Sequence, residues 1–189
     1  MEIATEGHGG RRAPTHQGFT LLEMLTATAL LAIVAVGAVP AAHTFLVRNQ
    51  VIAAAGEFVA ALNLSRLHAI TQGGNALMCP ADHGSYCTPA AGWHRGWIVF
   101  ADQNHNRQRE PAEPLIRRHG PVAGVRIVSS AARRRIQFRP DGASYGSNAT
   151  FLFCPDTQQV EGVAVVLSNP GRVRITRHPS PTQTALCGP

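Results

Sequence analysis

One uncharged stretch near the N-terminus restricts what this chain can form. Residues 19–47 carry a single formally charged side chain, the carboxylate of Glu23. As an α-helix, residues 19–39 alone would extend about 30 Å, which matches the hydrocarbon core of a bilayer. A carboxylate inside such a helix is costly unless it meets a partner. The stretch therefore predicts a membrane-spanning helix in which Glu23 has a specific partner.

The residues around this stretch set its orientation and exclude a removable secretory signal. Arg11 and Arg12 precede it in a polar leader that ends at Gly18. Positive flanks stay cytoplasmic, so the rest of the chain is expected to cross the membrane. No small-residue cleavage site follows the apolar run, unlike in a secretory signal peptide. Because no second long uncharged stretch exists, a membrane bundle is excluded as well.

The junction between leader and helix resembles a known processing site. Residues 18–25, GFTLLEML, resemble the class III leader junction of type IV pilins and type II secretion pseudopilins. The resemblance implies cleavage by prepilin peptidase between Gly18 and Phe19, followed by N-methylation of Phe19. It also implies that Glu23 pairs with the free amino terminus of a neighbouring subunit and so sets the register of assembly. Pro40 stands where pilins commonly carry a helix-kinking proline. The alternative is a plain single-pass anchor.

The helical pattern continues beyond the apolar stretch. Over residues 48–73, apolar residues recur at spacings of three and four, which predicts an amphipathic helix with one face under a head. Gly73 and Gly74 favour a helix end after Gln72. The positions that form the predicted face are Val51, Ala55, Phe58, Leu62, Ser65 and Ala69.

The rest of the chain reads as a β-rich head. Apolar or alternating runs are separated by turn residues, and no alternation of strands with helices appears, so antiparallel pairing is favoured. The tail, residues 178–189, is expected to be irregular but held by Cys187. The predicted strands are residues 76–79, 97–101, 125–129, 135–139, 150–154, 163–167 and 172–176.

Several head segments resemble the signature of the GspH/FimT group of minor pilins and pseudopilins. They are GWIVF at 96–100, DQNHN at 102–106, EPLIR at 113–117, IQFRPDG at 136–142 and LSNPGRVR at 167–174. The resemblance implies an α+β, type IV pilin-like fold in which a long N-terminal helix packs on two antiparallel sheets. The expected organisation is a leader (1–18), an apolar assembly helix (19–47), its amphipathic continuation (48–73) and a head (74–189).

Arginine supplies every basic side chain of this protein. The 17 basic residues outnumber 11 acidic ones and give a net charge of +6. Strand alternation places two arginine rows on sheet faces, and guanidinium groups suit phosphate oxygens. The alternative is a solvated face in an arginine-biased protein. The first row is Arg172 and Arg174, extended by Arg177; the second is Arg133, Arg135 and Arg139, with Gln137.

The first row also resembles a functional motif. Gly171, Arg172 and Arg174 form a GRxR pattern similar to the one with which FimT-type minor pilins bind DNA during natural transformation. The resemblance implies a non-enzymatic minor pilin of a type IV pilus, without cofactors, whose partners are DNA, other major and minor pilins, prepilin peptidase and the inner membrane. The alternative is a GspH-like minor pseudopilin of type II secretion that does not bind DNA.

Four cysteines favour an oxidising compartment such as the periplasm. Of the three possible pairings, we favour Cys79–Cys87 as a local loop and Cys154–Cys187 as a clasp on the tail. A zinc site formed by Cys79, His83 and Cys87 is a less favoured alternative, because no compact CxxC pair exists.

Two further motifs are weighed against simpler interpretations. The loop 102–113 has oxygen-bearing side chains at EF-hand-like places one, three, five, seven and twelve, but Arg107 occupies the place of the turn glycine. A polar hairpin loop is therefore favoured over a calcium site. Ser144 lies in a GASYG segment with nucleophile-elbow spacing, yet a strand is expected after it where an elbow needs a helix. The oxygen-bearing residues of the loop are Asp102, Asn104, Asn106, Gln108 and Glu113.

Overall fold

The computed structural model describes residues 18–188 except 83, 89, 131–132 and 158–159. It contains two compact units, Met1–Ala41 and Ala42–Pro189, which we describe separately. The predicted leader, apart from Gly18, lies outside the described residues. The long helix α1 (Leu21–Gln72) contributes residues to both units.

In the first unit, α1 begins where Thr20 caps it. The Thr20 hydroxyl oxygen accepts a hydrogen bond from the backbone N–H of Glu23 at 3.2 Å, which satisfies one of the free N–H groups of the first turn. The helix then continues through Pro40. An 18-residue segment of α1 has a mean hydropathy of 2.1, so this helix is long and apolar enough to cross a membrane.

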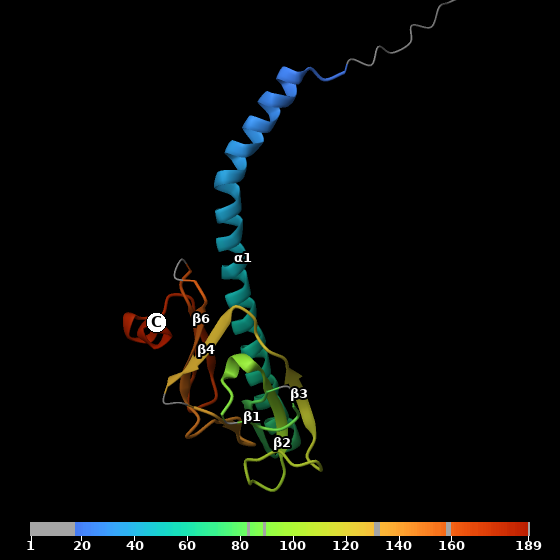
Figure 1. Cartoon of the computed structure of the whole chain (residues 1–189). Helices are drawn as coiled ribbons and strands as arrows, with labels where there is room; N and C mark the ends of the chain where they lie inside the picture. Colours follow the sequence, from blue (N-terminus) through green and yellow to red (C-terminus); the bar gives the residue numbers. More distant parts are fainter. Residues whose placement is uncertain (1–17, 83, 89, 131–132, 158–159, 189) are drawn as a thin grey trace, which may run out of the picture. The chain divides into compact units, whose positions relative to one another are not determined.

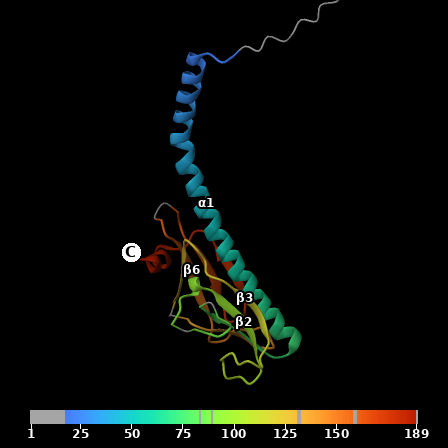
Figure 2. The same cartoon turned by 45° about the vertical axis from the view of Figure 1, so that its right-hand side comes forward.

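The second unit contains two four-stranded antiparallel sheets. One sheet has the order β3-β2-β1-β5 and the other has the order β4-β6-β7-β8, and Figures 1 and 2 show both beside the C-terminal part of α1. The strands are β1 (Asn75–Pro80), β2 (Trp97–Asp102), β3 (Leu115–His119), β4 (Val125–Ser129), β5 (Ile136–Phe138), β6 (Ala149–Pro155), β7 (Val163–Leu167) and β8 (Val173–Thr176).

The predicted apolar face of α1 packs against the head. All six residues predicted for this face are buried, and Ala54 and Ala61 are buried beside them. The helix ends after Gln72 because Gly73 adopts φ +63°, a left-handed conformation that favours glycine. The predicted fold, a long helix packed on two antiparallel sheets, is confirmed.

Phe58 of α1 links both sheets. Its ring lies 5.2 Å from that of Trp97 in β2, 4.8 Å from Phe151 and 5.5 Å from Phe153 in β6. It also contacts Trp93 in the 3₁₀ turn η1 (Trp93–Arg95) at 5.3 Å. These inclined aromatic pairs add to the burial of apolar area that holds helix and sheets together.

A disulfide closes a smaller apolar cluster on the outer face of each sheet. Cys79–Cys87 lies with Leu77, Ile98 and Phe100 of the first sheet. Cys154–Cys187 lies with residues of β6 and β7 of the second sheet and attaches the C-terminal segment to it. This is the pairing that we favoured from the sequence. The zinc alternative is wrong because Cys79 and Cys87 are joined to each other; His83 lies outside the described residues.

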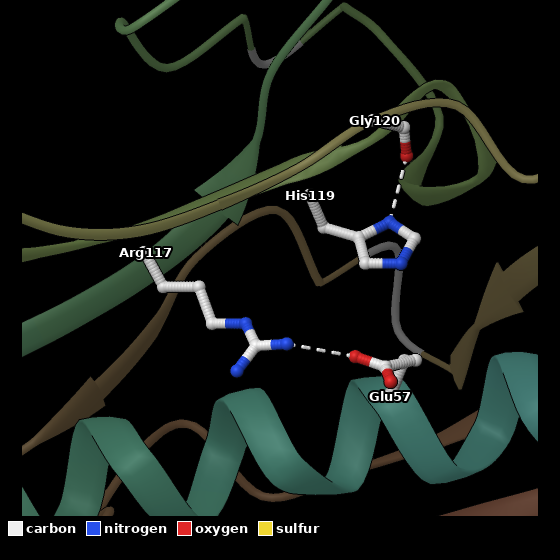
Figure 3. A network of polar contacts seen from close by, with 4 residues as sticks. All are labelled: Glu57, Arg117, His119 and Gly120. Atoms are coloured by element: carbon white, nitrogen blue, oxygen red, sulfur yellow. Dashed lines mark hydrogen bonds and ion pairs between the residues drawn. The ribbon is translucent and has the colours of Figure 1, made fainter.

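Strand β3 and the helical turns of the tail were not predicted. Strand β3 pairs with β2 at the edge of the first sheet, and there Arg117 forms an ion pair with Glu57 of α1 at 2.9 Å (Figure 3). The tail, expected to be irregular, contains the short helix α2 (Pro181–Thr184) and the turn η3 (Ala185–Cys187). Ser180 caps α2 in a capping box with Gln183.

Candidate nucleic-acid interface

Strand β8 forms one edge of the second sheet and carries Arg174, and Arg172 directly precedes it. Val173 packs against the core below α1. Arg174 pairs in register with Val166 of β7, and both arginines, Arg172 and Arg174, are exposed. Because side chains alternate along an extended chain, Arg172 and Arg174 lie on the outer face, about 6–7 Å apart along the strand.

The turn before β8 is held against a second turn of the chain. Gly171 adopts φ +77°, and a Cβ on it would lie 2.0 Å from the carbonyl oxygen of Gly142. Ser144 donates its hydroxyl to the carbonyl oxygen of Ser168 at 3.0 Å, and its N–H bonds the carbonyl oxygen of Asn169 at 2.8 Å. These contacts fix the position of Arg172.

The same contacts bring two more arginines to this end of β8. Arg66 of α1 donates from Nε to the carbonyl oxygen of Gly142 at 3.0 Å, and its Nε would lie 3.2 Å from a Cβ on Gly171. The backbone carbonyl of Arg139 accepts a hydrogen bond from the N–H of Gly142 at 2.8 Å. We call Arg66, Arg139, Arg172 and Arg174 the β8 arginine edge.

Among the described residues, the arginine–carboxylate pairs Arg95–Asp82 and Arg117–Glu57 involve none of the four edge arginines. One acidic residue, Asp141, lies in the same turn, where its Oδ1 accepts a hydrogen bond from the N–H of Ala143 at 2.9 Å. Four arginines and one carboxylate leave this edge with an excess of positive charge, which attracts anions.

Arg177 does not extend the first row, contrary to our prediction. Strand β8 ends at Thr176, and Arg177 lines a hollow together with Ile52 of α1, Val163 and Ile175. Because side chains alternate along an extended chain, Ile175 and Arg177 point to the opposite face from Arg172 and Arg174. Arg177 therefore lies on the side of the sheet that faces α1.

The second predicted arginine row, Arg133, Arg135 and Arg139, does not lie along a single strand. Strand β5 is limited to Ile136–Phe138, so Arg135 and Arg139 lie outside it. Arg133 is held at the end of β4, where its N–H bonds the Ser129 hydroxyl at 2.6 Å and its carbonyl oxygen accepts from the Trp93 indole at 2.8 Å. Arg133 and Arg135 are half-buried. Only Arg139 joins the Gly171 turn.

The remaining candidate residues have simple environments. Gly18, Phe19 and Glu23 are exposed at the start of α1. Ser144 is fully buried and its hydroxyl is occupied by Ser168, and the segment that contains it leads into strand β6, so it lacks the helix of a nucleophile elbow. Groups of three or more His, Cys, Asp or Glu side chains that could hold a metal ion are absent from the described residues.

Arg66 is the functional candidate that the sequence did not reveal. It flanks the buried face of α1, between Ser65 and Leu67, and nothing in its local pattern distinguishes it from a solvated helix residue. Its position depends on a contact with Gly142, 76 residues away.

Comparison with known proteins gives two family matches. The model of the family described as "Type II transport protein GspH" matches residues 54–171. The "Prokaryotic N-terminal methylation motif" matches residues 14–39. This motif implies processing by prepilin peptidase and assembly with other pilins, and with the apolar part of α1 it indicates membrane anchoring before assembly. No match was found among curated protein sequences.

Among solved structures, the chain is similar to the type IV minor pilin FimU of Pseudomonas aeruginosa strain PAO1. The TM-score is 0.55 at 20% identity, covering 70% of this chain and 92% of the other. A second crystal form of FimU matches with a TM-score of 0.49 at 19% identity, covering 66% and 90%. The first match shows a shared fold, and the GspH match extends over most of the chain. The protein therefore belongs to the GspH/FimT family, with the structural role of a minor pilin or pseudopilin in a type IV pilus or a type II secretion system.

Proposed function

We propose that this protein is a non-enzymatic minor pilin of a type IV pilus that holds DNA electrostatically for uptake. The observation that carries the proposal is the β8 arginine edge, in which Arg172 and Arg174 are exposed on one face while Arg66 and Arg139 lie at the adjoining turn. Guanidinium groups arranged in this way suit phosphate oxygens. Binding would be largely independent of base sequence and sensitive to salt.

The N-terminal segment would supply assembly in this proposal. Prepilin peptidase would cleave after Gly18, leaving Phe19 as the methylated terminus, and the head would lie in the periplasm. Residues 19–47 would serve as the membrane and assembly helix and residues 48–73 as its amphipathic continuation. Glu23 is exposed in the first turn of α1, where it can meet the amino terminus of a neighbouring subunit, and Pro40 lies within the assembly helix.

A second candidate function is favoured by the description of the matching family, which names a type II transport protein. In that case the chain is a minor pseudopilin, and the arginine edge contacts other subunits or solvent. DNA binding separates the two candidates.

The test is DNA binding by the soluble head, residues 48–189, which contains all the buried core residues and both disulfides. Each phosphate contact contributes about −0.9 to the slope of log K against log salt, so four contacts predict about −3.6. Arg172→Gln combined with Arg174→Gln should weaken binding and reduce the magnitude of the slope by about 1.8.

A matched control removes the same charge elsewhere. Arg118 on β3 and Arg126 on β4 are exposed and do not form the ion pairs described above, so the double change of both to Gln alters the net charge equally. The proposal requires that this control retain DNA binding. Equal weakening by both pairs would indicate attraction to net charge alone, and absence of binding at low salt would favour the pseudopilin.

A further inference from the structure

The loop between β2 and β3, residues 102–113, contains two acidic side chains that are buried together. Asp102 is 1% exposed and Glu113 is 4% exposed. Glu113 accepts hydrogen bonds from the N–H of Gln103 at 2.9 Å and of Glu110 at 3.0 Å, one on each carboxylate oxygen. The Glu113 carboxylate therefore bonds backbone groups near both ends of the loop.

Asp102 has an unsatisfied oxygen inside this loop. Its Oδ1 accepts from the N–H of Arg107 at 3.3 Å, which places the carboxylate against the middle of the loop. Its Oδ2 is buried and has no hydrogen-bond partner among the described residues. A buried carboxylate oxygen without a partner is costly, so Oδ2 favours a ligand from solution.

The neighbouring arginines do not provide the partner that Asp102 Oδ2 lacks. Arg109 donates from Nη1 to the carbonyl oxygen of Ser85 at 3.0 Å and from Nη2 to that of Glu113 at 3.4 Å, so its guanidinium bonds backbone rather than a carboxylate. The side chain of Arg107 is exposed. His105 is the other basic residue of this part of the loop, and its Nδ1 contacts the side-chain amide of Asn75 rather than Asp102. A cation from solution can therefore supply the partner that Oδ2 lacks.

The loop has the spacing and the turn of a calcium loop. Arg107, at the sixth place, adopts φ +60°, and its N–H points to Asp102. It thus makes the sharp turn for which glycine is usual, which removes the objection from turn geometry, and its charged side chain is exposed to solvent. The amide oxygens of Asn104 and Asn106 are turned toward the loop backbone, where they accept from the N–H groups of Asn106 at 3.1 Å and Gln108 at 2.7 Å.

We propose that this loop binds Ca²⁺ through oxygens of Asp102, Asn104, Asn106 and Glu113 and the backbone carbonyl of Gln108. Ca²⁺ prefers six to eight such oxygens, including amide and backbone oxygens, so the site does not require a third acidic ligand. Glu110, at the ninth place, accepts hydrogen bonds from the side-chain amide nitrogens of Asn104 at 3.0 Å and Asn106 at 2.7 Å. The amide oxygens of these two asparagines therefore point away from Glu110.

Because few formal charges face the cation, the affinity should be in the range of extracellular calcium modules, a Kd on the order of 10⁻⁴ to 10⁻³ M. The test is calorimetric titration of the full chain in detergent with CaCl₂, and thermal unfolding in 10 mM CaCl₂ or in EDTA. We expect one bound Ca²⁺ and a Tm higher by roughly 3–10 °C with calcium. Absence of binding up to 10 mM, or an equal Tm shift with MgCl₂, would overturn the proposal.

Two variants separate ligation from folding. Asp102→Asn keeps an oxygen for the Arg107 N–H but removes the charge, so it should lose the calcium-dependent Tm shift without lowering the Tm in EDTA. Glu161→Gln changes an exposed acid outside the loop and should retain the shift. An undiminished shift in Asp102→Asn would overturn the site, and this result does not depend on DNA binding.

Discussion

Gly171 and Gly142 touch through their backbones, although 28 residues separate them in the chain. A Cβ on Gly171 would lie 2.0 Å from the carbonyl oxygen of Gly142, and the same carbonyl accepts the Arg66 hydrogen bond. The glycine of the GRxR pattern therefore has a structural reason to be glycine. It allows the turn before β8 to dock at the end of α1, and so it positions Arg172.

Gly171→Ala should accordingly destabilise the head and weaken any DNA binding. The left-handed φ of +77° alone costs an alanine about 1–2 kcal/mol, and the clash with the Gly142 carbonyl adds to this cost. Gly146→Ala is the matched control, because Gly146 has φ +73° but open space around the position of its Cβ. Chemical denaturation of both variants checks the prediction; equal losses of stability would show that the backbone contact is unimportant.

Phe58→Ala should be among the most destabilising changes in the head. The ring is fully buried and contacts four aromatic side chains from both sheets and η1. Removing a buried Phe typically costs about 3–5 kcal/mol. Urea unfolding measures the loss, with Leu67→Ala, a 57% exposed position on the same helix, as a control that should change the free energy of unfolding by less than about 0.5 kcal/mol.

The elements that the sequence predicted are those that contain an apolar run or apolar residues at regular spacing. Phe58 and its neighbours at helical spacing revealed the buried face of α1, and β7, with buried Val163 and Leu167, was predicted with its observed bounds. Strand β3 was missed because it is an edge strand in which only Ile116 and His119 are partly buried, so it has no apolar run. The capping box at Ser180 was a local signal of α2 that we did not use.

The candidate site was predictable only where it depends on one strand. Alternation placed Arg172 and Arg174 together. Adding Arg177 to this row was wrong, because alternation puts position 177 on the opposite face and β8 ends at Thr176. Arg66 and Gly142 meet through the packing of α1 on a distant turn. Such contacts follow from the assembled core, and no local pattern in a single sequence indicates them.

The two disulfides should contribute unequally to stability. Cys79–Cys87 closes 8 residues and Cys154–Cys187 closes 33. In the chain-entropy account, these loops correspond to about 2.5 and about 3.7 kcal/mol respectively. Replacing each pair by serines and measuring denaturant unfolding tests the order. A greater loss from the shorter loop would mean that packing around Cys79, rather than chain entropy, determines the effect.

Glu23→Leu should impair assembly while leaving the head folded, because all the buried core residues lie at Val51 or beyond. Removing one member of an ion pair within an apolar environment costs about 3–5 kcal/mol, enough to reduce incorporation into filaments at least tenfold. Immunoblotting of sheared filaments against the membrane fraction measures this ratio. Thr28→Val is the control, since the Thr28 hydroxyl bonds only carbonyls of its own helix, at 2.9 and 3.0 Å; it should assemble normally. If Glu23→Leu assembles as well as Thr28→Val, Glu23 does not set the register between subunits.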